Sequence, residues 1–301
     1  MLQALASAFL LLVATVASAD AVVERVRFES LALDRDGGPA MLNAVWFRPA
    51  GTADRAIPAV IALHGCGGMY SIAKGRREEL SLRHRNMAEL LVAQGYAVLF
   101  PDSFRSRGRE EICTLALAER PITVAHRRLD ALGALVYLQS RADVDRERIA
   151  LLGWSHGGST VLAAMNARNA VVQRVRAAEP KAPFVRAAIA FYPGCMNALR
   201  AREGYAPAAP MLLLVGAADD WTSPKPCIAL VSRLESASLP ARIVVYPDTY
   251  HGFDGPSTQQ RLRLDVPGGV HPGKGVTVAV NPAAREDAYA RVQEFLRSTL
   301  P

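Results

Sequence analysis

Long apolar runs are scarce in this chain, and the one that stands out lies at its start. Beyond residue 19 no apolar stretch approaches the roughly 20 residues that a membrane-spanning helix needs. The sequence also lacks internal repeats, low-complexity segments and any linker that would divide it. In a chain of 301 residues, 50% of them hydrophobic, these absences predict one large domain over residues 20–301, without stable membrane insertion.

Motifs for nucleic acids, metals and phosphate-bearing cofactors are missing as well. The net charge is +7, but no Lys/Arg-rich tail and no basic stripe with interleaved aromatic residues occurs, so nucleic acid is not an expected partner. The cysteine spacings fit no common zinc site. Neither a Walker-type Lys-Ser/Thr nor a Gly-x-Gly-x-x-Gly fingerprint is present. We therefore expect no metal ion and no organic cofactor.

The apolar run at the start, residues 2–19, ends in Ala17-Ser18-Ala19, the small-residue pattern at which signal peptides are cleaved. Its uninterrupted apolar core is too short to span a bilayer comfortably. We therefore expect a signal peptide over residues 1–19, cleaved after Ala19, and a secreted or periplasmic mature protein.

Four cysteines follow the expected signal peptide. An even number of cysteines in an oxidising compartment predicts up to two disulfides. Cys195 and Cys227 each follow a predicted strand and form one candidate pair. Cys66 and Cys113, both in loops after strands, form the other. The spacing alone leaves the connectivity open.

Apolar segments typical of buried strands alternate along the chain with amphipathic segments typical of helices. This alternation predicts an α/β fold with a mostly parallel central sheet and helices on both faces. The first two strands flank a turn at 36–39 and are expected to form an antiparallel hairpin. Residues 252–280 form a long segment that is predicted to be a lid, a hairpin or an extension. Strands are predicted at 22–33, 41–47, 58–63, 96–100, 149–152, 187–192, 211–215 and 242–246, and helices at 82–94, 122–140, 159–166, 224–236 and 282–300.

One predicted strand runs directly into Gly153-Trp154-Ser155-His156-Gly157, and a helix-compatible segment follows. This is the sequence context of a nucleophile elbow, in which a sharp strand-to-helix turn raises a serine hydroxyl above the edge of the sheet. A Cβ atom at either glycine would collide with the neighbouring strand or helix. The alternative is a glycine-rich turn whose serine only caps the helix.

A serine hydroxyl needs a nearby base, and the base needs a third group to orient it. In α/β-hydrolases these groups follow the order nucleophile, acid, histidine. Here that order is met by Ser155, then Asp219 or Asp220, then His251. We favour Asp219 as the acid and interpret Asp220 as a turn or helix-capping residue. His251 follows a predicted strand, and Gly252 allows a sharp bend beside it.

The other histidines receive different predictions. His156 directly follows the nucleophile, so its side chain should point away and leave its backbone N–H free. His64 lies in a glycine-rich loop, His64-Gly65-Cys66-Gly67-Gly68, directly after a buried strand. Such a loop can supply a backbone donor to an oxyanion, and we expect the N–H groups of Cys66 and His156 to form the oxyanion hole. The remaining histidines, predicted to be surface residues, are His84, His126 and His271.

Taken together, these motifs resemble those of the dienelactone hydrolase family of α/β-hydrolases. The resemblance extends from about Leu42 to the final helix and implies hydrolysis through a covalent intermediate, with Ser155, Asp219 and His251 as nucleophile, acid and base. Dienelactone hydrolases proper use a cysteine nucleophile and carry a glutamate in the oxyanion loop, where this chain has Ser155 and Gly65. The segments that carry the resemblance are 64–68, 101–104, 153–158, 191–195, 216–221 and 251–253.

The sequence thus predicts an exported serine hydrolase acting on a small-molecule carboxylic ester or lactone. Two alternatives stay open: a peptidase or amidase of prolyl-oligopeptidase type, whose elbow is similar, and a non-catalytic binding protein with this fold. The intact order of the three residues argues against the second. A cluster of Arg105, Arg107 and Arg109 is interpreted either as a solvated loop or as a pocket rim that favours anionic substrates.

Overall fold

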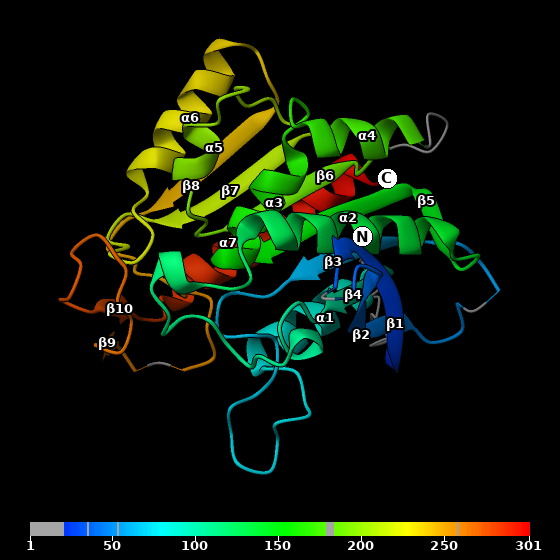
Figure 1. Cartoon of the computed structure of the whole chain (residues 1–301), viewed down its shortest axis with the longest axis horizontal. Coiled ribbons are helices and arrows are strands. Elements are labelled where there is room, and N and C mark those ends of the chain that lie inside the picture. The colour runs from blue at the N-terminus through cyan, green and yellow to red at the C-terminus, as the bar shows by residue number, and fades with distance from the viewer. Residues whose placement is uncertain (1–20, 35, 53, 179–183, 258) are drawn as a thin grey trace, which may run out of the picture.

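The computed structural model describes residues 21–34, 36–52, 54–178, 184–257 and 259–301. The predicted signal peptide lies outside the described residues. An eight-stranded sheet forms the centre of the molecule, with the spatial order β1-β2-β4-β3-β5-β6-β7-β8 (Figure 1). Its strands are β1 Ala21–Leu33, β2 Pro39–Pro49, β3 Ile57–Leu63, β4 Ala97–Pro101, β5 Val144–Trp154, β6 Ala187–Phe191, β7 Met211–Gly216 and β8 Ala241–Tyr246.

The sheet is antiparallel at one side and parallel elsewhere. Strand β2 pairs antiparallel with both β1 and β4, and every pairing from β4 to β8 is parallel. The turn between β1 and β2 contains Gly37 with φ of 82°, a conformation that suits glycine. The predicted initial hairpin and the mostly parallel sheet are therefore confirmed.

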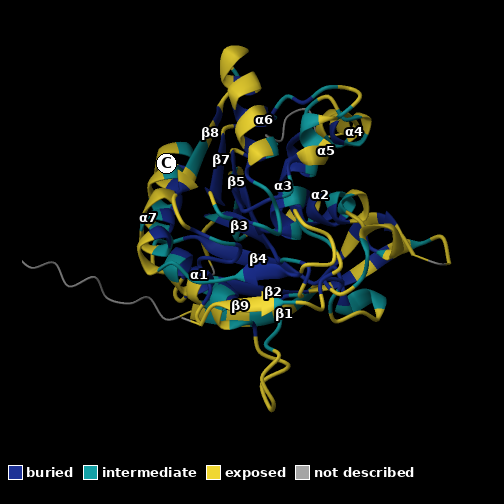
Figure 2. Ribbon diagram, turned by 90° about the vertical axis from the view of Figure 1, so that its left-hand side faces the viewer, coloured by how far each residue is buried: buried dark blue, intermediate teal, exposed yellow. Residues whose placement is uncertain are grey.

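Helices cover both faces of the sheet, as predicted. Apolar side chains of α2, α3 and α6 pack on one face, and those of α1 and α7 pack on the other. The strands lie buried between these layers while the outer helix surfaces are exposed (Figure 2). The helices are α1 Leu82–Val92, α2 Val124–Ser140, α3 His156–Met165, α4 Ala170–Ala178, α5 Met196–Leu199, α6 Lys225–Ser236 and α7 Pro282–Thr299, with short 3₁₀ turns at Arg105–Arg107 and Leu117–Glu119.

Several short elements were not individually predicted from the sequence. Helix α5 is a single turn, and α4 is a nine-residue helix that buries only Val172. In the long segment 252–280, β9 Arg261–Arg263 pairs antiparallel with β10 Val276–Val278. Of the three interpretations of that segment, a hairpin is therefore the one observed.

Two disulfides lie near the carboxyl ends of the strands, and one of them reaches into the first turn of α6. Cys66 pairs with Cys113, and Cys195 pairs with Cys227. Both candidate pairs are thus the pairs that form. Within the described part of the chain, no helix combines the length and apolar character needed to cross a bilayer.

Candidate active site

The turn between β5 and α3 holds Ser155 in an unusual backbone conformation, with φ of 52° and ψ of −115°. A positive φ in a residue with a Cβ atom is strained and persists only where the surroundings enforce it. A Cβ atom at Gly153 would lie 2.5 Å from the Gly157 carbonyl oxygen, and one at Gly157 would overlap the carbonyl oxygen of Leu63 in β3. Both glycines are therefore required by close main-chain contacts, as the sequence predicted.

Three side chains from the ends of different strands meet at this turn. His251 Nε2 lies 2.9 Å from Ser155 Oγ, and His251 Nδ1 lies 2.8 Å from Asp219 Oδ2. The three residues are nearly buried, with exposed fractions of 9% for Ser155 and 4% for the other two. The structure thus brings together the serine, the histidine and the favoured acid in one hydrogen-bonded series.

The carboxylate of Asp219 is held in place by its own turn. Its Oδ1 accepts the backbone N–H groups of Trp221, at 2.9 Å, and Thr222, at 2.8 Å. The Thr222 hydroxyl lies 3.0 Å from Oδ2, which is the oxygen facing His251. These contacts fix the direction in which the carboxylate points.

Asp220 lies in the same turn as Asp219, but its side chain points to a different partner. Its carboxylate accepts both the backbone N–H and the hydroxyl of Thr277, each at 2.7 Å, and so anchors β10. Helix α6 begins after Pro224 without a side-chain cap. Of the two interpretations of Asp220, a residue of the turn after β7 agrees with its position, whereas helix capping is wrong, because its side-chain partner is far away in the sequence.

Aromatic rings enclose the imidazole of His251. The ring centroids of Tyr192 and Trp221 each lie 4.6 Å from that of His251. Both residues belong to segments that carry the family resemblance, but the sequence analysis predicted no contact between either of them and His251. Their packing restricts the rotation of the imidazole and shields it from water.

The glycine-rich loop after β3 lies beside the serine. A Cβ atom at Gly65 would lie 3.6 Å from the Cβ of Ser155, so a larger residue there would contact the nucleophile directly. Neither the Cys66 N–H nor the His156 N–H donates to a protein acceptor in the described ranges. The loop is fixed by the disulfide to Cys113 and by a 2.8 Å hydrogen bond from Ile112 N–H to the Cys66 carbonyl.

His64 shapes the same loop from beneath. Its Nδ1 donates to the Gly65 carbonyl at 2.8 Å, and its Nε2 accepts the Ser103 N–H at 3.3 Å. This pattern requires a neutral ring. Complete burial, aided by the charge of Arg127, holds the pKa of His64 well below its ordinary value.

The His156 side chain turns toward α2, where Arg127 Nη1 donates to its Nδ1 at 3.0 Å. Burial and then the charge of Arg127 keep the pKa of His156 well below its ordinary value. The ring therefore acts as a neutral acceptor for Arg127, and the His156 N–H at the start of α3 has no intrahelical acceptor. This arrangement agrees with the predicted orientation of His156.

The dienelactone hydrolase family model matches residues 42–300 of this chain. The chain belongs to the dienelactone hydrolase family. It resembles the dienelactone hydrolase of Anabaena variabilis, with 21% identity and a TM-score of 0.56 over 92% of this chain and 99% of that one. It also resembles Thermogutta terrifontis esterase 2, phosphorylated by paraoxon, with 19% identity and a TM-score of 0.58 over 92% and 94% of the two chains.

A closer sequence match covers a smaller region. YtaP of Bacillus subtilis, which is named as a hydrolase, is 32% identical over 137 residues. The match covers 43% of this chain and 45% of YtaP, so it spans less than half of that relative. These comparisons establish a hydrolase family and an α/β-hydrolase fold, with neighbours that include dienelactone hydrolases and an esterase.

A buried carboxylate joins the two sides of the site in this family member. Asp254 accepts the Trp154 indole N–H at 2.7 Å and the Tyr192 hydroxyl at 2.6 Å, and Arg83 forms an ion pair with it at 3.1 Å. Trp154 precedes Ser155, whereas Asp254 lies three residues after His251. The carboxylate therefore links the serine turn to the histidine loop, which no sequence motif indicated.

Two arginines of the cluster 105–109 are engaged by acidic residues of the protein. Arg105 forms an ion pair with Glu78 at 3.1 Å, and Arg107 forms one with the buried Asp130 at 2.7 Å. Both guanidinium groups are thus occupied by protein partners. Neither is therefore a freely solvated side chain. Arg105 also lines a pocket beside Gly67 and Gly68 of the glycine-rich loop, so a place at the pocket rim stays a prediction.

His84 was predicted to be a surface residue, and this is wrong, because the side chain packs behind Trp154 with only 3% of its surface exposed. Its Nδ1 lies 3.0 Å from the Met69 carbonyl, and its Nε2 is buried without a partner. Burial lowers the pKa of His84 from 6.5 to about 4. The folded protein therefore holds this ring neutral under conditions in which the unfolded chain binds a proton.

We expect stability to fall on acidification for this reason. The neutral His84 ring makes its full contribution to the free energy of unfolding above pH 6.5. This contribution is lost progressively as the pH falls from 6.5 toward 4. When the pH falls from 6.5 to 5, the lowered pKa of His84 should by itself reduce the free energy of unfolding by about 2 kcal/mol. Urea unfolding at the two pH values measures this change.

The matched variants for this measurement are His84→Asn, whose amide can still donate to Met69, and His271→Asn at an exposed histidine. The first should lose about 2 kcal/mol less than the wild type over the same pH interval, and the second should behave as the wild type. An unchanged pH dependence in His84→Asn would show that His84 does not titrate in this way.

Proposed function

We propose that this protein is an exported serine hydrolase that cleaves a carboxylic ester or lactone through an acyl-enzyme. The proposal assigns Ser155 as nucleophile, His251 as general base and Asp219 as the acid that orients it. The observation that carries it is the continuous hydrogen-bonded series from Ser155 Oγ through His251 to Asp219, at 2.9 and 2.8 Å. Such a series activates a hydroxyl that is otherwise a poor nucleophile.

In the first step Ser155 Oγ attacks the carbonyl carbon while His251 Nε2 takes the hydroxyl proton. Asp219, which accepts the His251 Nδ1–H, fixes the tautomer that leaves Nε2 free and stabilises the imidazolium that forms. The carbonyl oxygen becomes negatively charged and receives hydrogen bonds from the N–H groups of Cys66 and His156. A donor of this kind is typically worth about 3 kcal/mol of transition-state stabilisation.

The tetrahedral intermediate then collapses, and His251 returns its proton to the alkoxy oxygen of the leaving alcohol. A water molecule, deprotonated by His251, attacks the acyl-enzyme. The second tetrahedral intermediate collapses as His251 returns this proton to Ser155 Oγ, and the acid is released. The scheme requires no metal ion or organic cofactor. Gly65 leaves no side chain that would compete with the substrate for the hydroxyl, which favours a serine esterase over the cysteine chemistry of dienelactone hydrolases proper.

Export is supported by two independent features. The sequence begins with an apolar run that ends in Ala17-Ser18-Ala19. The described cysteines are all joined in two disulfides, which form and persist mainly in oxidising compartments. Both features are expected of a protein that functions outside the cytoplasm.

The proposal is tested by labelling the mature protein with a fluorophosphonate probe and measuring its intact mass, beside a Ser155→Ala control. We expect a single adduct on the wild type, none on the control, and turnover of at least one ester in a panel of acyl esters. Faster turnover of aminoacyl anilides than of esters would favour the peptidase alternative. Absence of both adduct and turnover in well-folded protein would overturn the hydrolase proposal and favour a binding protein.

A further inference from the structure

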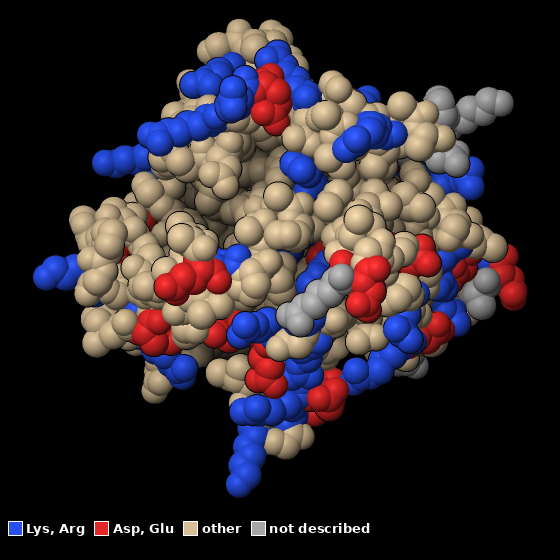
Figure 3. Space-filling model, viewed as in Figure 1, with Lys and Arg blue, Asp and Glu red and all other residues tan. Residues whose placement is uncertain are grey.

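A cavity of about 170 Å³ opens beside the helix that follows the proposed nucleophile. It lies between the start of α2, the outer side of α3 and the segment that contains α5, and the surface is hollowed near these elements (Figure 3). Ser159 and Gly194 line it, and the Ser159 N–H donates to the Ser155 carbonyl at 2.8 Å. The cavity therefore begins one helical turn from the proposed nucleophile.

The cavity combines an apolar lining with polar groups, most of which are already engaged by the protein. Ser159 Oγ accepts the Gly194 N–H at 2.8 Å, and the Tyr205 hydroxyl donates to the Leu162 carbonyl at 3.0 Å. Asn166 donates to the Gly204 carbonyl, and Asn169 donates to the Glu203 carboxylate. These groups have little capacity left for a ligand, and the apolar lining is formed by Val124, Ala125, Leu162, Ala163, Ala198 and Ala201.

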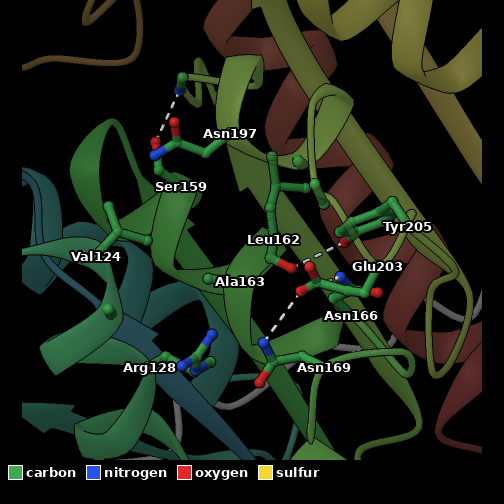
Figure 4. A pocket seen from close by; sticks show the side chains of 14 residues that line it. Val124, Arg128, Ser159, Leu162, Ala163, Asn166, Asn169, Asn197, Glu203 and Tyr205 are labelled. Carbon is green, nitrogen blue, oxygen red and sulfur yellow. Dashed lines mark hydrogen bonds between the residues drawn. The ribbon is translucent and has the colours of Figure 1, made fainter. Parts of the chain in front are cut away.

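Arg128 is the exception among the charged lining residues. Its side chain extends from α2 toward the cavity (Figure 4), and it forms neither a hydrogen bond nor an ion pair with any residue in the described ranges. Its Nε atom is fully buried. Burial lowers the pKa of Arg128 more than the attraction of Glu203 raises it, yet a guanidinium stays charged at neutral pH. The guanidinium is thus a half-buried cation that is attracted by Glu203 but forms no direct hydrogen bond or ion pair within the described ranges, which leaves its donors open to a bound anion.

We propose that this cavity binds the acyl chain of the substrate and that Arg128 binds a carboxylate at the far end of that chain. The inference rests on the proposed hydrolase function and narrows its substrates to half-esters of dicarboxylic acids with an aliphatic spacer. The apolar lining would bury the spacer, and the guanidinium is suited to bidentate binding of a carboxylate.

The acyl side of the ester is chosen because of the position of His251. The leaving alkoxy oxygen must face His251 Nε2, which reaches Ser155 from the end of β8. The cavity is lined by residues of α2, α3 and the segment around α5, and neither His251 nor the two aromatic rings packed on it are among the lining residues. Ala163, which lines the cavity with Arg128, is eight residues beyond Ser155, or about 12 Å along a helix that rises 1.5 Å per residue. An extended suberoyl chain has about this reach, whereas a succinyl chain is too short.

The experiment compares kcat/KM for monomethyl suberate with that for methyl octanoate, which has the same chain without the terminal carboxylate. We expect the wild type to prefer the suberate ester and Arg128→Met to lower the suberate-to-octanoate ratio about tenfold. Because both esters are measured on the same protein, a general loss of activity cancels from the ratio. Arg174→Met, which removes an exposed arginine of α4, is the matched control and should keep the wild-type ratio.

A substitution at Glu203 should change the suberate-to-octanoate ratio in the opposite direction. Glu203 places a carboxylate at the same cavity, so Glu203→Gln should raise the ratio several-fold by removing repulsion of the anionic chain. An equal ratio in the wild type and Arg128→Met would overturn the inference, as would a wild type that cleaves short acyl esters but neither of these two. Fluorophosphonate labelling of the wild type separates the two proposals: an adduct with an unchanged ratio removes only the inference, whereas no adduct removes the hydrolase function and the inference with it.

Discussion

Replacing Asp219 by asparagine is expected to lower kcat for ester hydrolysis by about 10⁴-fold, whereas Asp220→Asn should lower it by less than about tenfold. The two residues are adjacent and lie in the same turn, but only Asp219 contacts His251, at 2.8 Å. Asp220 instead binds Thr277 in β10. The two variants therefore make the same chemical change at neighbouring positions. Asp219 belongs to the hydrogen-bonded series with His251 and Ser155, and Asp220 does not.

The size of the first effect follows from the tautomer of the imidazole. An asparagine at position 219 can still accept the N–H groups of Trp221 and Thr222 through its amide oxygen, so the turn should remain folded. Its NH₂ group would then face His251 Nδ1 and favour the tautomer that carries the proton on Nε2. In that tautomer Nε2 cannot accept the proton of Ser155.

Single-turnover kinetics with an activated ester, together with the far-UV circular dichroism of both variants, measures the contrast. Similar losses in the two variants would show that the turn acts as a structural unit and that Asp219 has no special role. A larger loss in Asp220→Asn would reverse the assignment of the acid.

The arrangement at the sheet edge was predictable because it depends on local pattern and chain order. Parallel strands end at one edge, so residues that follow successive strands converge there. Ser155, Asp219 and His251 each follow such a strand, and their distances agree with the predicted order. The steric requirement for Gly153 and Gly157 was also predictable, because the strand-to-helix turn leaves no room for a Cβ atom.

Other parts of the site depend on partners that are distant in the sequence. Asp254 meets Trp154 and Tyr192 only after the sheet has formed, and the separations of 100 and 62 residues leave no local pattern. The ion pair between Arg107 and Asp130 was likewise not predictable from a local pattern. Without its acidic partner, a cluster of arginines has the pattern of a solvated or substrate-binding loop. The sequence therefore failed mainly for polar side chains that are buried in the folded protein, such as His84 and Asp254.

The contact at Gly157 leads to the prediction with the largest expected effect on stability. A Cβ atom there would overlap the carbonyl oxygen of Leu63 and lie 2.5 Å from that of His64. Leu63 is paired with Gly153 in the centre of the sheet, so it cannot move without disturbing the β3–β5 ladder. We expect Gly157→Ala to lower the unfolding free energy by about 3 kcal/mol, as measured by urea unfolding.

Gly268→Ala is the matched control, because a Cβ atom at Gly268 meets nothing within 4 Å. This variant should stay within about 0.5 kcal/mol of the wild type. If Gly157→Ala folds with normal stability, α3 must have moved away from β3, and the His156 N–H moves with it. The rate of fluorophosphonate labelling would then fall although Ser155, His251 and Asp219 are all present. Normal stability together with normal labelling would contradict the close approach of α3 to β3, on which the geometry of the elbow depends.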